Sequence, residues 1–180
     1  MNRPDSIRAT DSQRPLFCQF CGHNELTPRI EESAFKCAAC NRFTYLNSKP
    51  SACAIITRDE EVLLVTDGHS SPPTWDLPGG FLLHGEAPED GLRRELREEL
   101  CADVLVGHIV AAIVDTYANY TDFSLNLFYD VELISNALSP GPEIQAYGWF
   151  AINDLPSITH KSTLLILSDF ERLLRKGPQG

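Results

Sequence analysis

Three glutamates, at positions 95, 98 and 99, are the side chains of this sequence best suited to chemistry. In a helix that turns 100° per residue, this spacing puts the three carboxylates within about a third of the circumference. Neighbouring carboxylates repel one another, and a cation reverses that repulsion. Oxygen ligands at this density suit Mg²⁺ or Mn²⁺. The alternative is a solvated acidic face, which is the usual origin of a charge run.

A helix and a turn must position these glutamates. The helix is expected to begin near Pro88, because proline suits a first turn and acidic residues beside it favour the positive end of the helix dipole. Leu92, Leu96 and Leu100 form an apolar stripe beside the carboxylates that predicts a core contact. A Pro-Gly-Gly turn and a further acid, Glu86, precede the helix.

The stretch from Trp75 to Ala102 resembles the Nudix box, whose pattern is G-x5-E-x7-R-E-U-x-E-E-x-G-U with U aliphatic. One position departs from the pattern: Cys101 stands where the box has a glycine that normally caps the helix. That difference puts the cap geometry in question and leaves the metal site intact. The resemblance covers residues 50 to 175, and its charged positions all match: Glu86, Arg94, Glu95, Glu98 and Glu99.

The resemblance implies an α/β fold, a Nudix α/β/α sandwich with a mixed β-sheet. It also implies catalytic Mg²⁺ or Mn²⁺, with Glu98 and Glu99 as metal ligands and Glu95 as a further ligand or a residue that orients one. In the family a glycine carbonyl before the box binds metal, and we assign that role to Gly80. An ion pair between Glu86 and Arg94 is implied to hold the loop against the helix.

The general base of such an enzyme can lie outside the box. Several Nudix proteins use a glutamate on a loop before a late strand, and the segment from Glu143 to Phe150 matches a common form of that region. Glu143 is therefore our candidate base, and Glu95 competes with it. For the substrate, aromatic side chains could stack on an adenine or flavin ring, although aromatics in β-rich segments are more often core. These aromatics are Trp75, Tyr117, Tyr120, Phe123 and Phe128.

Four cysteines near the N-terminus form a second pattern. Two C-x2-C pairs, separated by 15 residues, can aim four thiolates at one ion in the closed tetrahedral geometry of structural zinc. The segment resembles a zinc ribbon. Rubredoxin-like iron and a redox C-x2-C are the alternatives; rubredoxin has a longer gap and a Cys-Pro in its second turn. The expected ligands are Cys18, Cys21, Cys37 and Cys40.

These patterns predict a flexible tail over residues 1–14, a zinc ribbon over 15–48 and a Nudix hydrolase domain over 49–180. We expect strands before and after the box helix and an amphipathic helix at the end of the chain. The leucine-rich stripe of that last helix is expected in the core; it comprises Leu164, Leu165, Leu167, Phe170, Leu173 and Leu174.

The composition and charge of the chain disfavour several classes of function and of cellular location. With 25 acids against 15 bases, the net charge of −10 disfavours nonspecific nucleic-acid binding, so no nucleic-acid partner is expected. No apolar run is long enough for a membrane span and no signal-peptide pattern follows Met1, so a cytoplasmic protein without a membrane partner is expected. Four cysteines in a metal pattern also indicate a reducing compartment.

The resemblance implies hydrolysis of the diphosphate bond in a nucleoside diphosphate linked to another moiety, by attack of water at phosphorus. A ribbon before a Nudix domain is similar to the NADH pyrophosphatases, whose S-Q-P-W-P-F-P-type motif does not occur after Ala102. Shorter relatives act on ADP-ribose or FAD, so an adenosine-containing small molecule of the ADP-ribose, FAD or NADH type is expected. A catalytically silent ligand sensor and a nucleoside-triphosphate pyrophosphohydrolase are the alternatives. A homodimer is a further possibility, because many Nudix enzymes are dimers.

Overall fold

The computed structural model describes residues 14–69, 71–117, 122–134 and 137–176. Of the tail expected over residues 1–14, all but Arg14 lies outside the described residues. Contacts between residues divide the chain into two compact units. The first comprises residues 1–48 with 116–123, and the second comprises 49–115 with 124–180.

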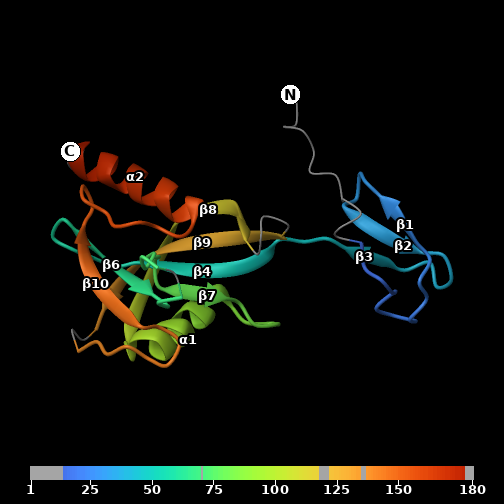
Figure 1. Cartoon of the computed structure of the whole chain (residues 1–180), viewed down its shortest axis with the longest axis horizontal. Coiled ribbons are helices and arrows are strands. Elements are labelled where there is room, and N and C mark those ends of the chain that lie inside the picture. Colours follow the sequence, from blue (N-terminus) through green and yellow to red (C-terminus); the bar gives the residue numbers. More distant parts are fainter. Residues whose placement is uncertain (1–13, 70, 118–121, 135–136, 177–180) are drawn as a thin grey trace. The chain divides into compact units, whose positions relative to one another are not determined.

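The first unit is a small antiparallel sheet (Figure 1) of β1 (Leu26–Arg29), β2 (Ala34–Cys37) and β3 (Phe43–Tyr45). Its core consists of two apolar side chains, Leu26 and Phe35, packed with Cys18 and Cys37. So few buried groups cannot stabilise a fold of this size by hydrophobic burial alone. A further source of stability, such as a bound metal ion, is therefore needed.

The second unit contains two sheets. The first has the order β7-β4-β9-β8 and is mixed, because β4 pairs antiparallel with β7 and parallel with β9. The second has the order β10-β6-β5 and is antiparallel. The strands are β4 (Lys49–Ile55), β5 (Thr57–Arg58), β6 (Glu61–Thr66), β7 (Gly79–Phe81), β8 (Val104–Tyr117), β9 (Asp122–Leu133) and β10 (Ala146–Ala151).

Two helices lie on opposite sides of these strands (Figure 1): α1 (Pro88–Leu100) and α2 (Lys161–Lys176). Successive side chains of β4 point to opposite faces and so contribute to both hydrophobic clusters. Ala52 and Ala54 pack in the cluster of α1, and Ile55 packs in the cluster of α2. The expected α/β/α sandwich with a mixed sheet is confirmed. Neither helix, over its described residues, is apolar and long enough to cross a bilayer.

The expected core stripe of α2 is wrong in part. Leu167 is fully buried, but Leu164 and Leu165 are 43% and 50% exposed. The buried face instead begins with two polar residues, Ser162 and Thr163, whose hydroxyls have hydrogen-bond partners in the sheet layer. Burial of a hydroxyl is tolerated when it is paired, and apolar periodicity does not detect such positions. The side chains of Phe170, Leu173 and Leu174 lie outside the described residues.

Candidate active site and zinc centre

Helix α1 presents the box glutamates in three different environments. It begins at Pro88 and is anchored by Leu92, Leu96 and Leu100, all fully buried. Glu95, on the turn next to this stripe, is 9% exposed, whereas the side chain of Glu98 is 46% exposed. The acidic row is therefore not a uniformly solvated face.

Arg94 is paired with Glu86, as the resemblance to the Nudix box implies. Its Nε and one terminal nitrogen donate to the two Glu86 oxygens at 2.9 and 3.0 Å, a bidentate contact. The backbone N–H of Leu83 also donates to Glu86, at 2.8 Å. These hydrogen bonds, that of Arg94 foremost, lower the pKa of Glu86 to about 2. The pair thus joins the loop that follows β7 to α1.

The same guanidinium also reaches two box glutamates. Its other terminal nitrogen lies 2.8 Å from Glu95 and 3.1 Å from Glu98. Arg94 therefore offsets part of the repulsion along the acidic row and fixes the direction of both carboxylates. Burial raises the pKa of Glu95 above its ordinary value despite this cation.

Glu99 points inward. It accepts a hydrogen bond from the backbone N–H of Gly79 at 2.9 Å. Burial, followed by the negative charges of Glu95, Glu143 and Asp76, raises its pKa to about 8. Carboxylates gathered in a poorly solvated place, with this degree of mutual repulsion, are a donor set that fits a hard divalent cation such as Mg²⁺ or Mn²⁺.

The two glycines before the box are required by close approaches. A Cβ on Gly80 would lie 2.5 Å from the Glu95 carboxylate, so the backbone of β7 runs directly against that side chain. Gly79 has φ of +139° and a Cβ there would lie 2.2 Å from the carbonyl of Ala52. Glycine at both positions lets the strand meet the acidic face of α1.

A cavity of about 480 Å³ opens beside these carboxylates, and Gly79, Glu99 and Glu143 are among its lining residues. Glu143 is thus brought to the same place as the box, although it follows Glu99 by more than forty residues. The cavity is a suitable volume for part of a nucleotide-sized ligand.

The aromatic candidates for substrate stacking are not gathered there. The described residues that line the cavity include neither Trp75 nor Phe123. Trp75 packs edge-to-face on Phe150, with ring centroids 4.6 Å apart, in the cluster under α2. Phe128 is fully buried in that same cluster. The Tyr117 side chain and all of Tyr120 lie outside the described residues.

Sequence reasoning missed most of the cavity wall, including a pair of titratable side chains, Asp76 and His160. Asp76 lies between the aromatic residue and the Pro-Gly-Gly turn that precede the box, but the Nudix pattern does not include it. His160 comes from the loop before α2, and no local signal connects it with the box. Their side chains are paired through His160 Nδ1 and Asp76 Oδ2.

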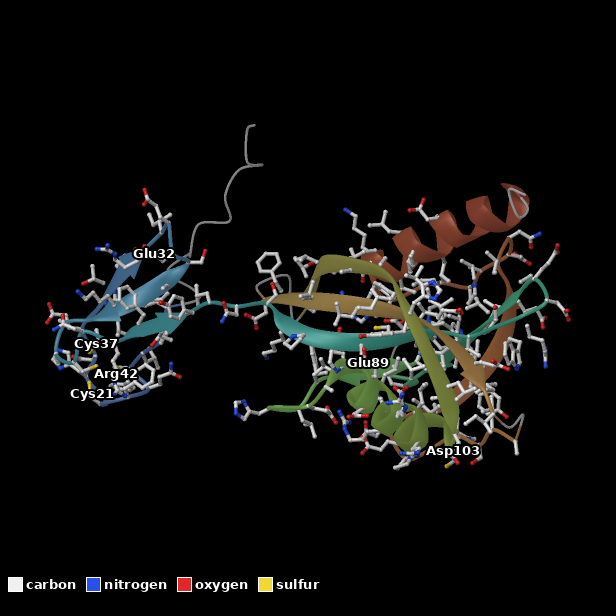
Figure 2. The ribbon with its side chains drawn as sticks, turned by 180° about the vertical axis from the view of Figure 1, so that it is seen from behind. Cys21, Glu32, Cys37, Arg42, Glu89 and Asp103 are labelled. Carbon is white, nitrogen blue, oxygen red and sulfur yellow. The ribbon has the colours of Figure 1, made fainter. Side chains whose placement is uncertain are left out.

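The four cysteine sulfurs of the first unit lie within 4.8 Å of one another. The Cys18–Cys40 and Cys21–Cys37 Sγ distances are 3.6 and 3.7 Å; Figure 2 labels Cys21 and Cys37. These distances far exceed a disulfide bond of about 2.05 Å. They match the edge of roughly 3.8 Å expected for a tetrahedron with Zn–S bonds of about 2.3 Å.

The two cysteine turns share one construction. Each begins with a cysteine whose carbonyl accepts from a residue with positive φ, Gly22 at 2.9 Å in the first turn and Asn41 at 3.1 Å in the second. In the first turn, a backbone hydrogen bond from Phe20 is the main effect that lowers the pKa of Cys18 to about 7. In the same turn a backbone hydrogen bond from His23 acts to lower the pKa of Cys21, but burial and hydrogen bonds with the other three cysteines raise it to about 12. The four thiols therefore ionise together only when a cation offsets their charge, and the thiolate is the form that binds metal.

Comparison with known proteins agrees with this geometry. The profile of the NUDIX domain matches residues 47–167, more than half of the chain. A NAD-capped RNA hydrolase NudC of Stutzerimonas stutzeri (strain A1501) is 29% identical over 149 residues, 82% of this chain and 52% of that protein. A protein of the same name from Pseudomonas entomophila (strain L48) is 30% identical over 143 residues, 79% and 50% of the two chains. The chain thus spans about half the length of these curated relatives.

Solved structures agree in fold. The crystal structure of a NUDIX hydrolase from Nitrosomonas europaea is 24% identical, with a TM-score of 0.71 over 89% of this chain and 93% of that chain. The crystal structure of a UDP-X diphosphatase has a TM-score of 0.62 at 22% identity, over 72% and 65% of the two chains. From the box geometry and the extent of the profile match, we conclude that this chain belongs to the Nudix family.

Proposed function

We propose that the protein is a divalent-metal-dependent Nudix pyrophosphohydrolase that cleaves the diphosphate bond of a nucleoside diphosphate linked to another moiety. The observation that carries this proposal is that Glu99 and Glu143 line one cavity, while the charge of Glu95 acts on Glu99 from the same helix. The backbone of Gly80 lies against Glu95. The products would be a nucleoside monophosphate and a phosphorylated fragment.

Each residue then has a defined part. Glu98 and Glu99 would hold Mg²⁺ or Mn²⁺, with Glu95 and the Gly80 carbonyl completing the protein ligands. When bound, the ion supplies the positive charge that neutralises phosphate oxygens and makes water more acidic. Arg94 is a positioning residue, because its contacts with Glu86, Glu95 and Glu98 fix where the carboxylates point.

Glu143 is the candidate base that takes the proton from the attacking water. It lines the cavity with Glu99, and its charge acts on both Glu95 and Glu99. Glu95 is the competing candidate, but one of its oxygens is held by the Arg94 guanidinium at 2.8 Å, and Glu95 is not among the described residues that line the cavity. Glu143 is therefore favoured.

The substrate is proposed to be an adenosine-containing diphosphate of the ADP-ribose, FAD or NADH type. The relatives' name, NAD-capped RNA hydrolase, points to a dinucleotide diphosphate. The cavity volume suits one half of such a ligand better than the whole.

The test is hydrolysis of a panel of dinucleotides, sugar nucleotides and nucleoside triphosphates with Mg²⁺ or Mn²⁺. Wild-type protein should cleave a dinucleotide diphosphate, and Glu99→Gln should lose most turnover, on the order of a hundredfold or more, while staying folded. Glu132→Gln, at an exposed glutamate of β9, is the matched control and should behave as wild type. Absence of turnover on every diphosphate would favour a catalytically silent ligand sensor. Preference for triphosphates would favour a nucleoside-triphosphate pyrophosphohydrolase.

A second candidate substrate is a dinucleotide attached to the end of an RNA, as the relatives' name states for them. One face of the sheet in the first unit favours this candidate. Phe43 and Tyr45 stack there with centroids 5.9 Å apart, and Lys36 Nζ lies 5.9 Å from the Phe43 ring. Tyr45 is exposed and Phe43 is half-buried, and accessible aromatic rings beside cations suit unpaired bases. Tyr45→Ala should then weaken turnover of a capped RNA and leave turnover of the free dinucleotide unchanged.

A further inference from the structure

The loop before α2 is fastened along the segment that leads into the box. The backbone N–H of Trp75 donates to the Ser157 carbonyl at 2.8 Å, and the N–H of Thr159 donates to the Trp75 carbonyl at 2.9 Å. The hydroxyls of Thr159 and Thr74 are also hydrogen-bonded, at 2.8 Å. This ladder brings His160, the residue before α2, to Asp76.

Asp76 is itself held in place by several donors. One of its oxygens accepts from the backbone N–H of Leu77 at 2.9 Å and from the hydroxyl of Thr163. The other oxygen pairs with Nδ1 of His160. Because a carboxylate only accepts, the proton of this contact lies on Nδ1. The imidazole is thereby oriented, and among the described residues no hydrogen bond engages its Nε2.

The pair lines the same cavity as Glu99 and Glu143. The lining includes four acidic side chains, and of its described side chains only His69 and His160 can carry positive charge. The Asp76 hydrogen bond raises the pKa of His160 above its ordinary value, which favours the imidazolium with a donor at Nε2. The oxygens of two adjacent phosphates can accept from such a charged donor, in addition to the ions that the glutamates would hold.

We propose that His160, oriented by Asp76, is a phosphate-binding site of this cavity, and that its Nε2–H donates to a non-bridging oxygen of a nucleoside diphosphate. The inference rests on the proposed function only in that the ligand is taken to be a nucleoside diphosphate. His160 is the binding residue and Asp76 the positioning residue. A contact made with both substrate and transition state changes KM more than kcat.

Steady-state kinetics with the best substrate of the panel test the site. His160→Gln should raise KM about tenfold and leave kcat within roughly twofold. His108→Gln removes an exposed histidine of β8 that is not in the cavity lining, and should match wild type. Unchanged KM in His160→Gln, or an equal loss in His69→Gln, would overturn the assignment.

Equilibrium binding separates this proposal from the catalytic one. The probe is α,β-methylene-ADP with Mg²⁺, whose P–C–P bridge cannot be hydrolysed, measured by calorimetry. Wild-type protein should bind it, His160→Gln should bind about tenfold more weakly, and Asp76→Asn should fall between them. Binding that depends on His160 in a protein without turnover would support the site while the proposed function failed. Equal binding by wild type and His160→Gln, or no binding by wild type, would overturn the site.

A spectroscopic measurement tests the part played by Asp76. The ¹⁵N shifts of the His160 imidazole should show protonated Nδ1 in wild type, and the Nε2 resonance should move when α,β-methylene-ADP is added. Asp76→Asn should alter the Nδ1 shift. The thermal unfolding temperature of this variant, recorded in parallel, shows whether it remains folded. An Nε2 resonance that does not respond to the probe would contradict direct phosphate binding by His160.

Discussion

The backbone N–H of Gly141 donates to the carbonyl of Glu99 at 2.7 Å, so the loop before β10 is attached to the C-terminal end of the box helix. Ser139 donates in the same way to the carbonyl of Leu100, at 3.1 Å. Carbonyls that a helix end leaves unpaired are thus satisfied by this loop. Glu143 follows two residues after Gly141, and the attachment explains how it reaches the cavity beside Glu99.

Replacement of Gly141 by alanine should separate this loop from α1. A Cβ at position 141 would lie 1.7 Å from the carbonyl oxygen of Glu98, which belongs to rigid helix backbone. We expect Gly141→Ala to lower the free energy of unfolding by about 1–3 kcal/mol and to reduce kcat at least roughly tenfold through displacement of Glu143. Urea unfolding and steady-state kinetics measure the two effects.

Ser139→Ala is the control for that loop, since an exposed side chain is removed and the backbone hydrogen bond to Leu100 stays. It should unfold and turn over as wild type does. If Gly141→Ala kept full kcat, the loop contact would not be what positions Glu143, or Glu143 would not be the base.

Local spacing was enough to predict the box helix and the cysteine cluster, and the resemblance to the Nudix box implied the Glu86–Arg94 pair. Each of these depends on residues that are near one another in the sequence or on a motif with fixed intervals. The α/β/α sandwich also followed, because the box resembles a family with that fold. Glu143 was predicted as a site residue from a second motif, and it lines the same cavity as Glu99.

The remaining parts of the site depend on long-range approaches that no local pattern encodes. His160 meets Asp76 across more than eighty residues, through a backbone ladder that carries no side-chain signature. The buried face of α2 includes Ser162 and Thr163, which apolar periodicity excludes. Trp75 is one of the candidates for stacking on the substrate, but its ring packs on Phe150, the core position that is the more frequent alternative for strand aromatics.

The cap of α1 keeps its usual form despite the absence of glycine. Cys101 has φ of 52° and ψ of 30°, and the N–H groups of Cys101 and Ala102 donate to Arg97 and Leu96 at 3.1 Å. Left-handed backbone is unfavourable for a residue with a Cβ. Cys101→Gly should therefore raise the free energy of unfolding by about 1 kcal/mol, measured by urea unfolding.

Cys101→Ala separates the backbone effect from the loss of the thiol. Alanine keeps the Cβ and hence the strain, so this variant should unfold close to wild type. If alanine stabilised the protein as much as glycine, the gain would come from removal of the exposed thiol and not from relief of left-handed strain.

The Glu86–Arg94 pair should make stability depend on pH in the acidic range. The folded-state pKa of Glu86 is lowered from 4.5 to about 2, so the folded protein binds fewer protons than the unfolded chain. The stabilisation is complete above the ordinary value and is lost as the pH falls toward about 2. The stability difference between wild type and Glu86→Gln should accordingly shrink from about pH 6 to about pH 3 in urea unfolding.

Glu61→Gln provides the comparison for that titration, because Glu61 pairs with Arg58 at 3.0 Å on an exposed surface. Exposed pairs contribute little, so this variant should differ from wild type by no more than about 0.5 kcal/mol at any pH. A difference for Glu86→Gln that stayed constant with pH would show that the glutamate acts through packing or hydrogen bonding in its neutral form, not through its charge.

The four-cysteine centre should bind one zinc ion that stabilises the first unit. Cys18→Ser removes one thiolate from a set of sulfurs that lie within 4.8 Å of one another, and three ligands cannot close the tetrahedron. In Cys18→Ser we expect the zinc content, measured by elemental analysis, to fall well below one ion per chain. A chelator should unfold the first unit of this variant more readily than that of the wild type. Cys101→Ala is again the control, because Cys101 lies outside the centre and its loss should leave zinc at one per chain. Stoichiometric zinc in Cys18→Ser would contradict the four-cysteine site, and iron in place of zinc in the wild type would support the rubredoxin-like alternative.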